Sequence, residues 1–167
     1  MSFVGIKNEK WNKPDVMVNS KAISDFTNQY LTLSSNGRSE TFSHGEYDVP
    51  NLIDKLEKAD PNTAFIKVSY EWNRYEKPIA MGVSVDHILK VDESGLTLDY
   101  GDHGDSFTTV NTIDTQAALL RKISEAESRR ENRLNPEKSV QSKREIPRQF
   151  EDITETARSS SFGPEVG

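Results

Sequence analysis

The segment Asp99–Phe107, DYGDHGDSF, is the densest cluster of chemically capable side chains in the chain. A calcium loop of the helix–loop–helix type needs oxygen ligands at positions one, three and five, where this segment has Asp99, Gly101 and His103. Glycine and aspartate residues between two segments of alternating apolar and polar residues are typical of a turn that joins two strands. We therefore predict a polar hairpin turn here, with a weak cation site as the alternative.

The three histidines, His44, His87 and His103, are the next candidates for chemistry. Three histidines suffice for a catalytic zinc ion, but these fall in three separate segments whose spacing does not bring them together. The chain also lacks the short motifs of phosphate loops, nucleophile elbows, zinc proteases and dinucleotide-binding folds. We expect surface or boundary histidines, no catalytic residue, no metal and no cofactor. A small hydrolase that depends on a metal or on one of these histidines is the alternative.

A binding motif is predicted near the carboxyl end, in the segment 146–157, IPRQFEDITETA. Its apolar residues follow the spacing i, i+4, i+7 and i+11 of one helical face: Ile146, Phe150, Ile153 and Ala157. A helix of this length is marginal by itself, but it can fold when it lies in a groove on another protein. We predict that these four residues contact a protein partner.

The amino-acid composition limits the remaining classes of function. Hydrophobic residues make up 34% of the 167 residues, charged residues 29%, and the net charge is −6. This charge disfavours nucleic acid as the main partner, so we expect only weak or indirect contact with RNA. Absence of cysteine excludes disulfides and thiolate metal sites. No leader and no apolar run long enough to span a membrane is evident, so we expect a soluble protein that is not secreted.

The composition changes near Arg130. Residues 131–167 hold three prolines, a serine run and few apolar side chains, so they offer little apolar surface to offset the entropy of ordering. We predict a folded core over residues 1–130 and a flexible polar tail over residues 131–167.

The core reads as an α+β domain, a mainly antiparallel sheet flanked by two or three helices. Helices are predicted over residues 21–30, over residues that follow Asp48, and from Asp114 to Arg130. Alternating apolar residues predict strands over 64–72, 78–85, 96–100 and 107–111, and Asn36-Gly37 predicts a hairpin turn. We see no internal repeat in the sequence.

This outline, with its break at AESRRENR (residues 126–133), resembles the packaging accessory protein of the inner capsid of segmented double-stranded RNA bacteriophages. The resemblance covers the outline and no residue-specific motif. It implies a place in the virion or the host cytoplasm and capsid or polymerase subunits as partners. We predict a non-enzymatic protein–protein interaction factor that self-associates to a dimer and assists capsid assembly, RNA packaging or transcription. An acidic inhibitor of a partner enzyme is a further alternative.

Overall fold

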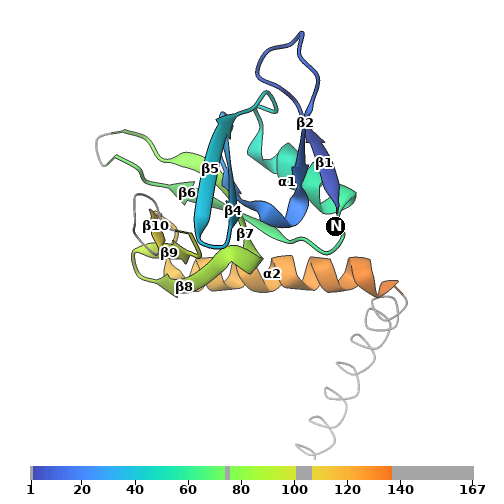
Figure 1. Cartoon of the computed structure of the whole chain (residues 1–167). Coiled ribbons are helices and arrows are strands. Elements are labelled where there is room, and N and C mark those ends of the chain that lie inside the picture. Colours follow the sequence, from blue (N-terminus) through green and yellow to red (C-terminus); the bar gives the residue numbers. More distant parts are fainter. Residues whose placement is uncertain (1, 74–75, 101–106, 137–167) are drawn as a thin grey trace, which may run out of the picture. The chain divides into compact units, whose positions relative to one another are not determined.

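The α+β class is confirmed by the computed structural model, which describes residues 2–73, 76–100 and 107–136. Antiparallel strands and two α-helices form these ranges (Figure 1). The elements are β1 (Phe3–Ile6), β2 (Val16–Asn19), β3 (Ile23–Phe26), β4 (Tyr30–Ser35), β5 (Arg38–Ser43), α1 (Val49–Ala59), β6 (Phe65–Tyr70), β7 (Ile79–Ser84), β8 (Ile88–Asp92), β9 (Gly95–Leu98), β10 (Thr108–Asn111) and α2 (Gln116–Leu134). Short 3₁₀ turns precede β3 (η1, Ser20–Ala22) and β8 (η2, Val85–His87).

Internal contacts group Met1–Arg130 into one unit and Glu131–Gly167 into another. The predicted tail lies outside the described residues from residue 137 onward.

A five-stranded sheet in the order β5-β4-β3-β7-β6 separates two hydrophobic clusters. On one face, the β1–β2 hairpin and α1 cover residues that include Phe26, Leu31 and Phe65. On the other face, the three-stranded sheet β10-β9-β8 and α2 cover residues that include Val68, Val83 and Leu96. Figure 1 shows α1 beside the β1–β2 hairpin, and α2 begins next to β8, where the Gln116 amide contacts the Val91 carbonyl. Burial on both faces makes the sheet the centre of the core.

The order of elements occurs twice along the chain, which corrects our prediction that the chain has no repeat. The series β1-β2-η1-β3-β4-β5-α1 is followed by β6-β7-η2-β8-β9-β10-α2. We call residues 2–59 repeat 1 and residues 64–134 repeat 2. In the segment from β2 to β4, five residues are identical to their counterparts in repeat 2, and the two members of each pair are separated by the same number of positions. The pairs are Val18/Val83, Ile23/Ile88, Leu31/Leu96, Thr32/Thr97 and Leu33/Leu98.

Irregular features recur as well as regular ones. Both β3 and β8 carry a bulge at their second residue, Ser24 and Leu89. An isolated bridge joins the end of β5 to the segment after β1, with Gly45 N–H donating to Lys7 O at 2.7 Å, and its counterpart is Ile113 N–H to Ser69 O at 3.1 Å. Because bulges and isolated bridges are local irregularities that the strand pattern does not require, their recurrence indicates a true structural repeat.

Each repeat also contains what we call a carboxylate latch. In repeat 1, Glu46 Oε2 accepts hydrogen bonds from the Lys7 N–H and from Lys55 Nζ, both at 2.7 Å. In repeat 2 the corresponding residues are Asp114, Ser69 and Lys122. Asp114 accepts hydrogen bonds from the Ser69 N–H at 2.7 Å and from Lys122 Nζ at 2.9 Å. The latch ties the α-helix of each repeat to its first strand, at the residue after β1 in repeat 1 and at the penultimate residue of β6 in repeat 2.

The two repeats join through β3 and β7, which pair antiparallel with Asp25 opposite Val83 and Phe26 opposite Gly82. Gly82 is required at this joint, because a Cβ there would lie 2.3 Å from the Phe26 ring. We refer to this pairing as the β3–β7 joint.

Several local predictions are confirmed. Asn36 and Gly37 have positive φ, 54° and 78°, and form the tight turn between β4 and β5. Asp48 caps α1 by accepting the Asn51 N–H at 3.0 Å. The strands predicted over residues 78–85, 96–100 and 107–111 are present as β7, β9 and β10.

Three predictions are wrong. The helix over residues 21–30 is absent, since residues 23–26 form β3, which is buried along its whole length between β4 and β7. The i, i+3 spacing of its two apolar residues, Ile23 and Phe26, also fits one face of a helix, so the pattern does not distinguish strand from helix. Asp114 does not cap α2; Thr115 does, through Oγ1 to the Ala118 N–H at 3.1 Å. The strand predicted over residues 64–72 is present as β6, but the prediction of one buried and one exposed face fails at its ends: Phe65, expected on the exposed face, is buried against α1, and Trp72, expected on the buried face, is exposed.

Candidate functional site

Ser34, His87 and Asp99 meet where the two repeats touch, and they are the residue types of a nucleophile–base–acid triad. Both Ser34 Oγ and Asp99 Oδ1 face the same ring nitrogen of His87, Nδ1, at 3.0 and 2.8 Å. The other nitrogen, Nε2, lies 2.8 Å from the Lys21 carbonyl oxygen. A triad needs the serine and the carboxylate on opposite nitrogens. The buried His87 therefore joins strands by hydrogen bonds in this arrangement and does not activate Ser34.

Beside it lies a buried carboxylate. Asp25 Oδ2 accepts a hydrogen bond from the Tyr100 hydroxyl at 2.9 Å. Burial raises the pKa of Asp25, although hydrogen bonds from Tyr100 and from neighbouring hydroxyls act in the opposite direction. Burial, followed by the nearby Asp25 charge, raises the pKa of Tyr100. The pair connects β3 of repeat 1 to the end of β9 in repeat 2, which is a role in packing.

His44 is also buried, contrary to the surface or boundary position that we predicted. Its Nε2 lies 2.8 Å from the Thr27 carbonyl oxygen, and its Nδ1 accepts the Glu46 backbone N–H at 3.0 Å. The neighbouring carboxylates are engaged elsewhere, Glu46 in the latch and Asp48 in the α1 cap. Among the residues that the structure describes, no group of three metal-ligating side chains is present. His103 and the predicted turn at residues 101–106 lie outside those residues.

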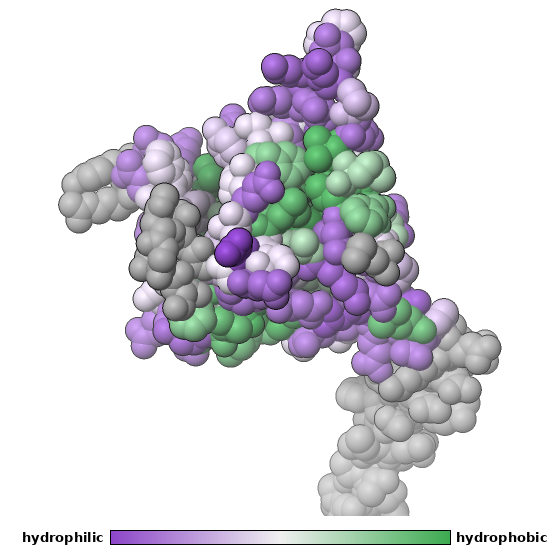
Figure 2. All heavy atoms as spheres, viewed as in Figure 1, coloured by the Kyte–Doolittle hydropathy of each residue, from purple (hydrophilic) through white to green (hydrophobic). Residues whose placement is uncertain are grey.

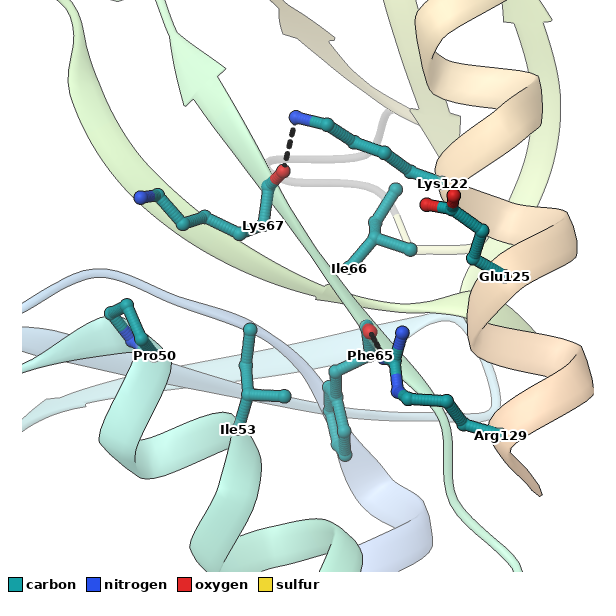
Figure 3. Close-up of a pocket in the computed structure, with 8 residues that line it drawn as sticks. All are labelled: Pro50, Ile53, Phe65, Ile66, Lys67, Lys122, Glu125 and Arg129. Atoms are coloured by element: carbon teal, nitrogen blue, oxygen red, sulfur yellow. Dashed lines mark hydrogen bonds between the residues drawn. The ribbon is translucent and has the colours of Figure 1, made fainter. Parts of the chain in front are cut away.

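The outer edge of β6 is closed by charged side chains from both helices. Arg129 donates to the Phe65 carbonyl oxygen at 3.0 Å and Lys122 to the Lys67 carbonyl oxygen at 2.7 Å (Figure 3). Glu57 accepts the Phe65 N–H at 2.9 Å, and the latch residue Asp114 accepts the Ser69 N–H. These contacts occupy the groups that another strand would use, so β6 is a protected edge.

A groove of about 370 Å³ lies along this closed edge, between α1 and α2. Pro50 and Ile53 line one side, and Lys122, Glu125 and Arg129 line the other (Figure 3). Since Lys122 and Arg129 are committed to the β6 carbonyls and to the carboxylates of Asp114 and Glu57, the groove has few free groups for a ligand.

A more distinctive surface lies at the tip of the β1–β2 loop. Trp11 is 95% exposed, and it lines a hollow of about 280 Å³ together with Tyr47, Lys7 and Lys13. The tip is an ordered turn, since the Lys13 N–H donates to the Lys10 carbonyl oxygen at 3.0 Å. We call the group Lys7, Trp11, Lys13 and Tyr47 the Trp11 surface.

Tyr47 is unusual in three ways. Its side chain is 62% exposed, its φ is +59°, and it has no counterpart in repeat 2, where Asp114 is followed directly by the helix cap Thr115. A left-handed conformation at a bulky residue costs about 1 kcal/mol. A costly conformation that presents an aromatic ring to solvent is a reason to look for function at that position.

The Trp11 surface was not among our predicted site residues. Its signal in the sequence was a tryptophan between lysines in a polar loop, NEKWNKPD, which offers no apolar partner for the ring. The predicted partner-binding residues Ile146, Phe150, Ile153 and Ala157 lie outside the described residues.

Comparison with known proteins gives little further guidance. No family model matches the chain, and no curated protein matches it. Among solved structures, a LytTr DNA-binding domain from Bacillus cereus aligns with 74% of this chain and 97% of its own length, at 17% identity and a TM-score of 0.35. At that score the likeness defines neither fold nor function. Within the described residues, neither helix has the length and apolar character needed to cross a membrane.

Proposed function

We propose that this chain is a non-enzymatic protein–protein interaction factor and that the Trp11 surface is its contact with a partner protein. The observation that carries the proposal is the near-complete exposure of Trp11 beside the exposed Tyr47. Tryptophan and tyrosine are the residues most enriched among those that dominate binding energy at protein interfaces.

The energetics support a contact of this kind. Burial of a tryptophan side chain removes about 150–250 Å² from water, which at about 25 cal/mol per Å² is worth about 4–6 kcal/mol before the costs of association. Trp11 contributes almost none of this to its own fold, since it stays exposed there. Lys7 and Lys13 lie beside the rings, and Glu9 and Asp15 line the same hollow, so the surface offers charges of both signs to polar groups on the partner.

Two further parts of the proposal come from the sequence. The tail residues Ile146, Phe150, Ile153 and Ala157 form a second contact, and the resemblance to the phage packaging accessory proteins suggests capsid or polymerase subunits as partners. Neither part depends on the Trp11 surface, so each can fail separately.

The test is quantitative co-purification of tagged full-length chain from its natural source, with the partner identified by mass spectrometry. We expect Trp11→Ala to weaken binding of that partner about thirtyfold, as for loss of about 2 kcal/mol at a central interface residue. Tyr47→Ala should act in the same direction, and nuclease treatment should leave the complex intact.

Trp72→Ala is the matched control, because Trp72 is an exposed tryptophan that follows β6 in repeat 2, as the Trp11 loop follows β1 in repeat 1. Equal loss of the partner in both variants, or retention in Trp11→Ala, would show that the Trp11 surface is not the binding site.

A further inference from the structure

In the described ranges, the repeat leaves two strand edges without the partner that their counterparts have. Within the chain, β3 of repeat 1 pairs with β7 of repeat 2. The counterpart of β3 is β8, which is the terminal strand of the sheet β10-β9-β8. The counterpart of β7 is β2, which pairs only with β1 among the described residues. Within the residues that the structure describes, one molecule therefore presents one unpaired edge of each kind that the joint brings together.

We propose that a second copy of this chain pairs its β2 with β8 of the first, and so repeats the β3–β7 joint between molecules. This inference goes beyond the proposed function, since it uses neither the Trp11 surface nor the tail. In the expected register, Lys90 lies opposite Val18 of the second copy and Val91 opposite Met17, as Asp25 and Phe26 lie opposite Val83 and Gly82.

Backbone groups at the two edges are directed as the joint requires. The tight turn closes β8 and β9 at Asp92 and Gly95, so the N–H and C=O of Val91 point away from β9. In β2, Ser20 N–H donates to Ser2 O, which places the groups of Asn19 and Met17 on the side away from β1. With respect to the described part of the chain, both edges therefore offer free donors and acceptors, apart from a 3.3 Å contact of the Gln116 amide with the Val91 carbonyl.

The exposure of the side chains at the two edges also supports the proposed contact between β2 and β8. At the joint, Ser24 is fully buried, whereas its counterpart Leu89 is 55% exposed. Met17, the counterpart of Gly82, is 60% exposed. Figure 2 shows hydrophobic areas over β8 and around the β1–β2 hairpin. Apolar side chains thus occupy the two edges that the proposed contact would cover.

Side-chain volumes also match. In the joint a large residue, Phe26, lies over a residue without a side chain, Gly82. Between molecules a smaller residue, Val91, would lie over a larger one, Met17. Exchanges that conserve total volume in this way are the ones that packed interfaces tolerate.

A hollow next to β2 provides room for the incoming strand. It has a volume of about 580 Å³ and lies between the β2 residues and the β4–β5 hairpin. Its apolar lining includes Val16, Val18, Leu33 and Phe42. In repeat 2 the corresponding place beside β7 is occupied by β3, which supports a strand as the occupant.

A contact between two different edges is head-to-tail, so it continues from one molecule to the next and gives a ring or a filament. This proposal extends the dimer that we predicted from the sequence, because a contact between two different edges leaves one edge of each kind open after two copies have joined.

The test uses full-length chains and sedimentation velocity over a range of concentrations. Wild-type chain should form species larger than a dimer, whereas Leu89→Lys and Met17→Lys should each be monomeric, because every contact needs one intact β8 and one intact β2. A mixture of the two variants should form a one-to-one dimer, since one supplies the intact β8 and the other the intact β2. Leu120→Lys, a substitution at an exposed leucine on α2, should assemble like wild type.

A second measurement uses the absence of cysteine from the chain. The double variant Met17→Cys, Val91→Cys should give a ladder of disulfide-linked species on oxidation, because facing strand residues lie within disulfide range. Each single cysteine variant should stop at a dimer or below. A wild-type chain that stays monomeric with no ladder from the double variant, or a lysine variant that still assembles alone, would overturn the proposal. Trp11→Ala should not change assembly, which separates this proposal from the proposed function.

Discussion

Repeat 1 and repeat 2 correspond in the elements that form the scaffold and differ at exposed residues and strand edges. Their strands, bulges, helix caps and carboxylate latches correspond. They differ at the exposed aromatic residues Trp11 and Tyr47. Among the described residues, β3 and β7 pair with each other, whereas the counterpart edges of β8 and β2 have no strand partner. The comparison teaches that matched residues maintain the scaffold, and that unmatched residues and unpaired edges are the places to look for function.

The largest expected effect on stability is in the hydrophobic core, where the equivalence of the two repeats can be tested. Leu31 and Leu96 are counterparts and both are buried, so replacement of either by alanine should lower the free energy of unfolding by about 2–5 kcal/mol. Urea denaturation followed by circular dichroism measures the change. Leu120→Ala, at an exposed position, should change it by less than about 0.5 kcal/mol. If one of the two core variants proved neutral, the repeats would not be energetically equivalent.

The latches are the next test. Burial opposes ionisation of Glu46 and Asp114, but hydrogen bonds from the latch lysines and backbone N–H groups outweigh it and lower the pKa of both carboxyls. Removal of either carboxylate, in Glu46→Ala or Asp114→Ala, should cost about 1–2 kcal/mol at pH 7. Asp54→Ala removes an exposed ion pair with Lys58 on α1 and should cost less than about 0.5 kcal/mol.

The latches also predict a pH dependence. A lowered pKa in the folded state means that the stabilisation is complete above the ordinary values of 4.5 for Glu46 and 3.8 for Asp114, and is lost as the pH falls through the folded values. The alanine variants should therefore lose less stability than wild type on acidification below about pH 4.5. Parallel acid titration curves for wild type and variants would contradict the assignment.

The smallest expected effect is at Asp25, where the sign is reversed. Burial raises its pKa, so its contribution is most favourable below the ordinary value of 3.8 and declines as the pH rises through the folded value. Asp25→Asn keeps an acceptor for the Tyr100 hydroxyl and removes the cost of a buried charge. We expect stability at pH 7 that is unchanged or higher by about 1 kcal/mol, measured by thermal unfolding. A clear loss would show that the carboxylate is needed, through the hydrogen bonds that it accepts from the neighbouring hydroxyls and its attraction to His87.

Local signals made part of the fold predictable. The dipeptide Asn36-Gly37 defines its hairpin because few other residues adopt two successive positive φ values. Asp48 with Pro50 marks the start of α1, because a cap and an early proline satisfy the free amides of a helix terminus. These signals depend on neighbours in the chain, so a single sequence contains them.

Features that depend on distant contacts were missed. β3 is buried because β4 and β7 flank it, and its four residues carry no period that distinguishes a strand from a helix. The repeat was not evident in the sequence because loops of different length separate the matched elements, as at the inserted Tyr47. Identical runs are therefore short, such as LTL at residues 31–33 and 96–98, and the two repeats cannot be aligned over their whole length at one separation. The Trp11 surface requires knowledge that Tyr47, far along the chain, shares its hollow.

The closure of β6 has a consequence for synthesis of the chain. Phe65 and the residue that covers its carbonyl, Arg129, are separated by 64 positions. At about 5–20 residues per second, the ribosome needs about 3–13 seconds to make the intervening segment. During that interval only Glu57 of α1 is available to cover the outer side of the nascent strand, so the folding protein is most vulnerable to wrong pairing late in translation, just before its second helix emerges.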